Sequence, residues 1–531
     1  MTRIESQESS VGQAPSVATG EAGAPDRLPG TSISSVDLLA VAGLIVLLAF
    51  LWGRGRHVWF WLDEGISVGI SSHPLSEIPA LLRQDGSPPL YYVVLHLWMS
   101  IFGTSDEAAH LLSLVFALIT VPAALWAGWS LFGRRAGWMV ATLVAISPFV
   151  GSYANEARMY TLVALLGLLV TATFLHAFVF RRRRYLPGFA VCLALLLYTH
   201  NWALFLALGT GVALLGCIAL APPAARLDIL RDGALAFGGA AVLYAPWVPS
   251  LLYQLAHTGA PFTLRPTLLL VRKDLIDLLG GPEAVIVLGL GSGVAFMTLL
   301  RGPWGRKAVG VLAAIVIAGV AVAAGWAFSR QDSVWVYRYL AVVVGPLLLV
   351  LGAGLAEGGR NAVAALGLTV ALVGPIAVKG QAFEKSNVKE VTTQLGPALR
   401  PGDLVIADFG RVPVLAHYLP AGLLYAETTG PVADEYASGQ RDATRRLEEG
   451  RPEQTLSPSL DALASGSHLL VVCSAGTLPL DATQFLRLVR QRCDEALAIP
   501  ANDGRFRLEA TVAAPPYGSN SPVNGYLFTK L

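Results

Sequence analysis

Charged residues are scarce in this sequence, and their signs nearly cancel. Asp, Glu, Lys and Arg make up 14% of the 531 residues, and the formal net charge is +2. Such a chain has no overall basic field for nucleic acid, and we expect no nucleic-acid partner. Hydrophobic residues make up 54%, with a mean hydropathy of +0.57, which is more apolar surface than a soluble domain of this size buries. The composition therefore predicts a polytopic α-helical membrane protein.

Cysteine is also scarce: the sequence has four cysteines, and no two of them are spaced as CxxC. Cys192 and Cys217 lie in apolar stretches, whereas Cys473 and Cys493 lie in the polar C-terminal region. We therefore expect no metal or redox motif built on cysteine. Residues 1–35 lack the basic start and the cleavage site of a signal peptide, and their richness in Gly, Ser, Pro and Ala predicts a disordered cytoplasmic tail.

Long apolar runs, in contrast, are abundant. A membrane-spanning helix needs roughly 20 apolar residues. Eleven segments approach that length and predict about 11 transmembrane helices within residues 36–380: 36–53, 108–132, 136–153, 159–179, 186–200, 202–220, 233–253, 283–300, 308–328, 339–356 and 361–378. No Asp, Glu, Lys or Arg lies near the middle of these segments, where ion-coupled transporters commonly carry such groups. This absence favours chemistry at the membrane surface over transport.

The run Pro88 to Gly103 decides the topology, since its 16 residues could span the membrane or lie in the interface. If it is interfacial, the basic connections all fall on one side of the membrane. These connections contain Arg134, Arg135, Arg181 to Arg184, Arg226, Arg231, Arg301, Arg306, Lys307 and Arg360. The positive-inside rule then predicts a cytoplasmic N-terminus and an extracytoplasmic C-terminus. We expect the chain to lie in the plasma membrane. Residues 53–106 become the first outer loop.

Residues 381–531 are polar and rich in turns. Strand-like runs at 403–407, 468–473 and 507–512, with a helical pattern at 482–497, predict a small extracytoplasmic α/β domain. An oxidising outer compartment would allow a disulfide between Cys473 and Cys493, although two such cysteines can equally be buried thiols.

Two acidic residues stand out in the first outer loop. In WFWLDEG, Asp63 and Glu64 follow three aromatic residues suited to a membrane interface. Carboxylates held at the bilayer surface can act as a general base toward a lipid-borne reaction centre. Alternatively, they are acids at a helix N-terminus, where the helix dipole favours them.

Further polar residues lie at the predicted outer ends of other helices. YANEARMY carries Glu156, Arg158 and Tyr160 where the chain turns back into the membrane, either as functional charges or as an ordinary loop pair. In VWVYRYL, Arg338 is placed to bind a phosphate at headgroup depth or to anchor the interface by snorkelling. His200 of YTHNW lies in a turn, where a histidine is often simply solvated.

Together these motifs, with DGSPPLYYVVLHLW, SDEAAHLLSLVFALITVPAALWAGWSLFGRRAG and SPFVGSYANEARMY, resemble the bacterial GT-C glycosyltransferases of the family 39 kind. These include relatives of the protein O-mannosyltransferases and the aminoarabinose transferases of lipid A. The likeness covers about residues 36–380. It implies a GT-C fold in which the first outer loop forms juxtamembrane helices over a cavity for a lipid-phosphate sugar. The run 88–103 would be one of these helices.

The resemblance also implies roles for single residues. Asp63, with Glu64 beside it, and Glu156 match acidic positions and are our candidate catalytic residues. Arg158 and Arg338 match basic positions associated with the donor phosphate. We assign the substrate pocket to Tyr160, His200 and Tyr339. In one departure from the pattern, Ser87 stands where the aminoarabinose transferases have a basic residue before the Pro, so phosphate binding would depend more on the arginines.

The expected activity is inverting transfer of a hexosyl or pentosyl group, mannose-like or other, from a polyprenyl-phosphate carrier to a lipid, glycan or protein acceptor of the cell envelope. Asp63 would act as the base, and the arginines would stabilise the leaving phosphate. A glycine-rich nucleotide motif is not expected for such a donor. No cofactor is assigned, although a divalent metal could bridge Asp63 and Glu156. A transporter or flippase of lipid-linked glycans, or a membrane scaffold without catalysis, is the alternative function.

Overall fold

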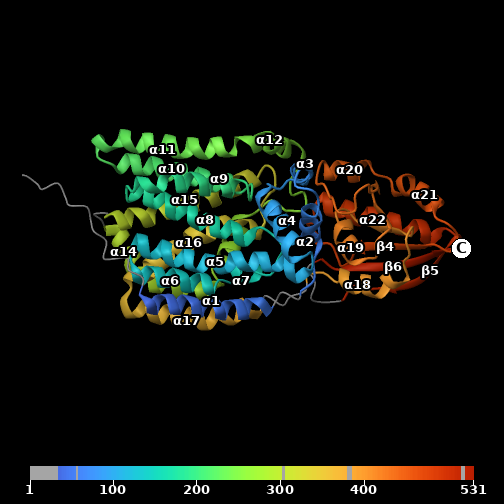
Figure 1. Cartoon of the computed structure of the whole chain (residues 1–531), viewed down its shortest axis with the longest axis horizontal. Helices are drawn as coiled ribbons and strands as arrows, with labels where there is room; N and C mark the ends of the chain where they lie inside the picture. The colour runs from blue at the N-terminus through green and yellow to red at the C-terminus, as the bar shows by residue number, and fades with distance from the viewer. Residues whose placement is uncertain (1–33, 55–57, 302–304, 380–384, 516–520) are drawn as a thin grey trace, which may run out of the picture.

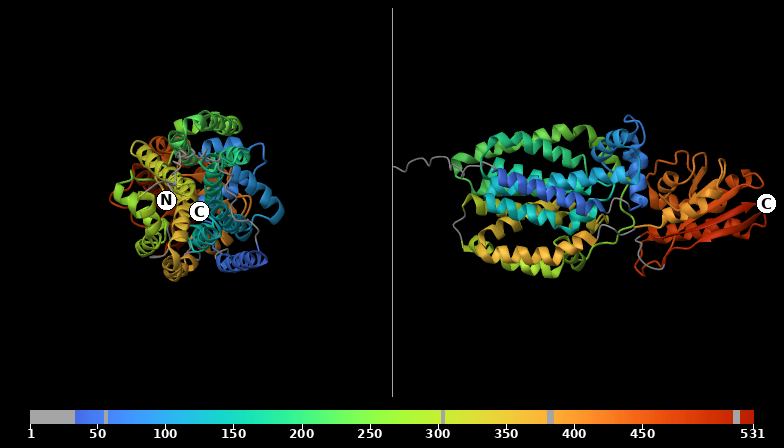
Figure 2. Two further views of the ribbon diagram at one scale, coloured as in Figure 1. Left: turned by 90° about the vertical axis from the view of Figure 1, so that its left-hand side faces the viewer. Right: turned by 60° about the horizontal axis from the view of Figure 1, so that its bottom comes forward.

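The computed structural model describes residues 34–54, 58–301, 305–379, 385–515 and 521–531. Long helices run side by side in one bundle, and the C-terminal α/β domain lies at one end of it (Figure 1). Seen along its length, the bundle is several helices across in both directions (Figure 2). The predicted N-terminal tail lies outside the described residues, apart from Ser34 and Ser35, which begin the first helix.

Eight helical segments of the described chain are long and apolar enough to cross a membrane. They are α1 (Ser35–Trp52), α5 (Asp106–Phe132), α8 (Tyr160–Phe174) continued by η2 (Leu175–Val179), α10 (Ala203–Leu220), α11 (Pro223–Tyr244) continued through η4 (Ala245–Trp247) by α12 (Val248–His257), α15 (Arg306–Ser329), η5 (Tyr337–Leu340) with α16 (Ala341–Glu357), and α17 (Gly359–Lys379). A ninth would be α13 (Leu268–Leu278) with α14 (Pro282–Arg301), a pair bent by 72°. The protein is therefore a multi-pass membrane protein.

The predicted eleven segments are all helical, but two of them carry helices shorter than expected. Helices α6 (Arg134–Ala145) and α9 (Leu186–Leu197) have 12 residues each. In the first case Ser147 caps a new helix, α7 (Pro148–Tyr153), because its side chain accepts from the Val150 N–H. The segment 136–153 is therefore two helices joined by a bend rather than one.

Glycines allow the long helices to approach closely. A side chain at Gly167 of α8 would lie 2.6 Å from the Val342 carbonyl of α16, and one at Gly345 of α16 would lie 2.5 Å from the Leu168 backbone of α8. The two glycines thus face each other's helix at the same crossing. Small residues at such contacts let backbones pack where apolar burial alone gives no preference between lipid and protein.

Three short helices follow α1 at the end of the bundle next to the C-terminal domain: α2 (Leu62–Ser71), α3 (Ile78–Asp85) and α4 (Leu90–Phe102) (Figure 1). Helix α4 corresponds to the ambiguous run 88–103. It has 13 residues and is therefore too short to span the hydrocarbon core as a helix. Its His96 Nδ1 lies 2.9 Å from the Ser71 carbonyl, which ties α4 to the end of α2.

The C-terminal domain is a six-stranded mixed sheet in the order β3-β2-β1-β4-β6-β5. Strands β1 (Leu404–Ala407), β2 (Leu424–Glu427) and β4 (His468–Ser474) are parallel, and β3 (Gly430–Pro431), β5 (Phe506–Val512) and β6 (Val523–Lys530) pair antiparallel. Its helices are α18 (Val388–Leu395), α19 (Val412–Tyr418), α20 (Ala443–Glu449), α21 (Pro452–Ala462) and α22 (Gln484–Asn502). The three predicted strands and the helix at 482–497 are present.

A disulfide joins Cys473 of β4 to Cys493 of α22, with Cα atoms 5.8 Å apart. The alternative of two buried thiols is therefore wrong. Strands β2, β3 and β6 were not predicted. β2 has only four residues between turns, and β6 directly follows a stretch rich in Pro, Ser and Asn.

The C-terminal domain packs directly on α2. A side chain at Gly65 would lie 2.5 Å from Val414 of α19, and one at Gly69 would lie 2.3 Å from the Tyr436 carbonyl. Tyr418 donates to the Asp106 carboxylate at 2.8 Å and accepts from the Phe60 N–H at 2.7 Å. The first outer loop is therefore held between the bundle and the α/β domain.

Candidate active site

The first turn of α2 orients the two acidic residues differently. Trp61 caps the helix with extended backbone, and Glu64 Oε2 accepts from the Trp61 N–H at 3.3 Å. Glu64 is 2% exposed, and its Oε1 lies 2.7 Å from His110 Nε2 and accepts from the Ala157 N–H at 2.7 Å. These contacts join α2, α5 and the turn before α8. These contacts indicate that Glu64 stabilises the structure of the site rather than reacting with substrate.

Asp63 faces the other way and meets a cation. Its Oδ2 lies 3.1 Å from Arg338 Nη2, and the two side chains are 16% and 18% exposed. The Arg338 guanidinium also lies over the rings of Trp61 and Tyr339, at 5.6 and 5.7 Å from their centroids. The ion pair holds the Asp63 carboxylate in one position, and a general base needs such a fixed carboxylate.

Arg158 lies on the same side of α2. Its Nη1 donates to Ser67 Oγ at 2.9 Å, to Tyr92 Oη at 3.2 Å and to the Asp63 carbonyl at 3.4 Å. The guanidinium carbon is 5.9 Å from the Tyr160 ring centroid. Asp63, Arg158 and Arg338, which come from three distant parts of the sequence, therefore lie around one point, as the motifs predicted.

Glu156, the third candidate catalytic acid, is 1% exposed and is paired with Lys385. Lys385 lies 5.5 Å from the Trp61 ring centroid and 5.9 Å from that of Tyr153. Asp63 and Glu156 thus each face a cation. Among the described residues, no group of three His, Cys, Asp or Glu side chains is arranged to hold a metal ion.

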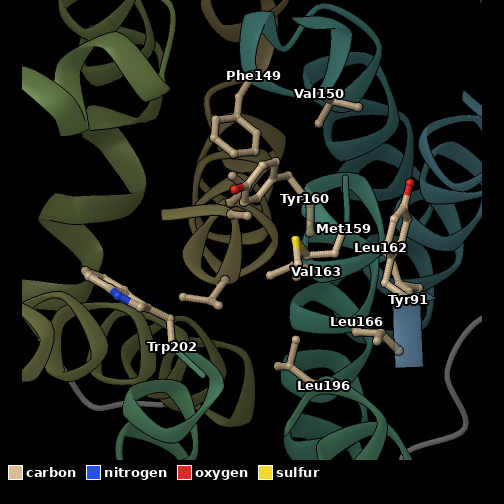
Figure 3. Packing of buried hydrophobic residues seen from close by; sticks show 14 of the residues in the cluster. Tyr91, Phe149, Val150, Met159, Tyr160, Leu162, Val163, Leu166, Leu196 and Trp202 are labelled. Atoms are coloured by element: carbon tan, nitrogen blue, oxygen red, sulfur yellow. The ribbon is translucent and has the colours of Figure 1, made fainter. Parts of the chain in front are cut away.

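The three residues assigned to the substrate pocket form one aromatic cluster. The His200 ring is 4.7 Å from the Tyr339 ring and 6.2 Å from the Tyr160 ring, centroid to centroid. Tyr160 also lies beside Phe149 in the packed interior (Figure 3). His200 is 7% exposed, so the interpretation of a solvated turn histidine is wrong. Burial, with the nearby charges of Arg158 and Arg338, lowers the pKa of His200 to about 3. Its ring is therefore neutral at pH 7, and Nδ1 accepts from the Trp202 N–H.

Several buried polar atoms at this point have no hydrogen-bond partner within the described part of the chain. They are Trp61 Nε1, Glu156 Oε1, Arg158 Nε, Tyr160 Oη and Arg338 Nε. Buried polar groups are nearly always paired in native proteins, and each exception calls for an explanation. Five such atoms in one cluster make this point the candidate site for a polar ligand.

Three residues of this cluster were not among the candidates predicted from the sequence. Lys385 stands beside Glu156, and Tyr92 stands beside Arg158. Asp85 is half-buried at the end of α3, where burial raises the pKa of its carboxyl while its bond with Ser87 and the charge of Arg158 oppose that rise. Asp85 and Tyr92 both lie in the quoted DGSPPLYYVVLHLW motif, which could have drawn attention to them. For Lys385 the sequence carries no such signal.

Short helices and the α/β domain cover a charged cluster at one end of the multi-pass helical bundle. The fold is therefore that of an integral membrane protein with a candidate site at the end of the bundle. No family model and no curated protein matches the chain. Solved structures do. ArnT from Cupriavidus metallidurans bound to undecaprenyl phosphate matches with a TM-score of 0.61 at 14% identity, over 93% of this chain and 98% of ArnT.

Two further solved structures also match the chain. ArnT from Cupriavidus metallidurans in the apo state has a TM-score of 0.57 at 14% identity, over 92% of this chain and 98% of ArnT. The mycobacterial arabinofuranosyltransferase AftD has a TM-score of 0.53 at 14% identity, over 94% of this chain and 40% of AftD. The chain therefore has the GT-C fold that the sequence motifs predicted.

Proposed function

We propose that this protein is an inverting glycosyltransferase that moves a sugar from a polyprenyl-phosphate carrier to an acceptor of the cell envelope. The observation that carries the proposal is the placement of Asp63 between Arg338 and Arg158 at the end of the bundle. A carboxylate base and two guanidinium groups at one point are what a sugar phosphodiester and an acceptor hydroxyl require. The ArnT neighbour binds undecaprenyl phosphate, which supports a carrier of this kind.

In this mechanism the acceptor oxygen attacks the anomeric carbon from the face opposite the phosphate. Asp63 takes the acceptor proton as the new C–O bond forms. The bond between the anomeric carbon and the phosphate oxygen breaks, and its electron pair stays on the phosphate. Arg158 and Arg338 stabilise the charge that develops there, because groups fixed before the reaction need no reorganisation during it.

Two observations support an extracytoplasmic site. The Cys473–Cys493 disulfide lies in the domain that covers the site, and disulfides persist mainly in oxidising compartments. Asp106, at the start of α5, contacts that domain, whereas Arg134 directly follows the end of α5. A 27-residue helix is about 40 Å long, so the basic connection at Arg134 lies on the opposite side of the membrane from the site.

Mass spectrometry of cell-envelope glycans and lipids tests this function. A strain lacking the protein should lose one hexosyl or pentosyl modification, which the wild-type gene restores and the Asp63→Asn variant does not. An unchanged envelope profile in the deletion strain would contradict a transferase. Restoration of the profile by Asp63→Asn would instead favour a scaffold or flippase.

A further inference from the structure

The charged cluster contains more carboxylates than arginines. Asp63 pairs with Arg338, Asp85 interacts with Arg158, and Glu156 faces Lys385. Glu64, on the same turn of α2 as Asp63, is a fourth carboxylate of the cluster. An excess of carboxylates repels an anionic ligand, so a cation besides the two arginines favours one, and Lys385 is such a cation.

Lys385 is also close to the phosphate-binding candidates. Its ammonium nitrogen lies 5.5 Å from the Trp61 ring centroid, and the Arg338 guanidinium lies 5.6 Å from the same centroid. The two cations therefore share one indole ring. The Lys385 side chain is 24% exposed, so part of it is accessible to a ligand.

We propose that Lys385 binds the phosphate of the polyprenyl carrier together with Arg158 and Arg338, an inference that rests on the proposed transferase function. The donor is a phosphodiester with one negative charge. The released monoester carries about −1.5 to −2 at pH 7. The need for positive charge thus grows as the sugar leaves, and a third cation meets it. An ammonium group on a flexible stem with three donors can follow the phosphate oxygens as they gain charge.

The C-terminal domain positions this lysine. Lys385 lies between α17 and α18, and its carbonyl accepts from the Ser521 N–H at 2.8 Å. The following Asn387 pairs with Val523 of β6 through two hydrogen bonds of 2.7 and 2.9 Å. The α/β domain therefore contributes a side chain to the site at the end of the membrane bundle, and its docking is part of phosphate recognition.

Binding of undecaprenyl phosphate to the full-length protein in lipid nanodiscs tests this proposal. Lys385→Gln should weaken binding about tenfold, the order expected for one hydrogen bond to a charged group. Lys385→Arg should stay within about threefold of wild type because the charge is kept. Undecaprenol, which lacks the phosphate, should bind the wild type and Lys385→Gln equally. Lys389→Gln, a change of the interface lysine that pairs with Asp106, is the control and should bind as the wild type does.

The double variant Glu156→Gln with Lys385→Gln separates phosphate binding from simple neutralisation of Glu156. If Lys385 contacts the phosphate, binding stays weak in the double variant. Recovery of wild-type affinity there, or unchanged affinity in Lys385→Gln alone, would overturn the proposal while leaving the transferase function intact. A wild-type protein that does not bind undecaprenyl phosphate would contradict the proposed function itself.

Discussion

Arg338 Nη2 and Asp63 Oδ2 form an ion pair at 3.1 Å. Arg338 lies at the start of the span Tyr337–Glu357, whereas Asp63 lies in the first turn of α2. The pair joins the proposed base to a proposed phosphate ligand. In the proposed mechanism, an incoming donor phosphate would compete with Asp63 for the same guanidinium, and the carboxylate would then be released toward the acceptor hydroxyl.

Arg158→Lys and Arg338→Lys should each reduce donor affinity and transfer, about tenfold or more, because Lys keeps the charge but loses the planar fork that binds two phosphate oxygens. Carrier binding and sugar transfer by the purified variants are the measurements. Arg134→Lys, which alters an arginine paired with Asp37 at the other end of α5, is the matched control. Wild-type donor affinity in both site variants would rule out this role.

Glu64→Gln should lower stability more than it lowers donor binding. Glu64 accepts from two backbone N–H groups and lies against His110, so the neutral amide loses charge-assisted bonds worth about 1 to 3 kcal/mol. Thermal unfolding of the detergent-purified protein measures the difference. The exposed Glu77→Gln change should leave the unfolding temperature unchanged. An unaltered unfolding temperature in Glu64→Gln would show that these contacts do not hold α2 in place.

Acid should destabilise the protein partly through His200. The pKa of His200 is about 3 in the folded state, against an ordinary value of 6.5, so the unfolded chain binds a proton between these values and the folded one does not. Stability therefore falls as pH drops from about 6.5 toward 3, by at most about 1.4 kcal/mol per pH unit. His200→Gln should reduce this dependence in unfolding measured at pH 7 and pH 5. An identical pH dependence in the two proteins would contradict a buried neutral imidazole.

The predicted topology can be read with reporter fusions. A reporter after residue 379 should be active outside the cytoplasm, and one within Arg181 to Arg184 should be active inside, because the positive-inside rule predicts cytoplasmic basic connections. The opposite pattern would place the site in the cytoplasm. After alkylation of free thiols, the C-terminal domain should also change its gel mobility with reductant, as the Cys473–Cys493 disulfide requires.

The sequence predicts the bundle well because an apolar run of about 20 residues is long enough to span a membrane, and in lipid it must form a helix to satisfy its own backbone hydrogen bonds. It fails where short helices are decided by packing. Helices α6 and α9 have 12 residues each, and Ser147 divides the segment that was taken as one span. In the α/β domain, buried runs such as His468–Ser474 were recognisable, whereas the four residues of β2 form a strand through pairing with β1 and β3.

The candidate site shows the same limit. Asp63, Arg158 and Arg338 stand out locally, since charges next to apolar segments are rare. Lys385 carries no local signal, because its role depends on Glu156, far away in the sequence. The different orientations of Asp63 and Glu64 likewise depend on His110 and Arg338, which no local pattern relates to α2.

In the proposed mechanism Asp63 is the base. Asp63→Asn keeps the size of the side chain and can still hydrogen-bond, but it cannot take the acceptor proton. Sugar transfer is measured with purified protein, a polyprenyl-phosphate sugar and a membrane acceptor extract. Asp37→Asn is the control, because Asp37 is also paired with an arginine but lies at the other end of α5, and it should transfer sugar normally.

Asp63→Asn should transfer sugar about 100-fold to 10,000-fold more slowly than the wild type, the range that general-base catalysis supplies. Donor binding should persist, since Arg158 and Arg338 remain. Transfer by Asp63→Asn at the wild-type rate would contradict the claim and move the role of base to another residue, with Glu156 the first to test.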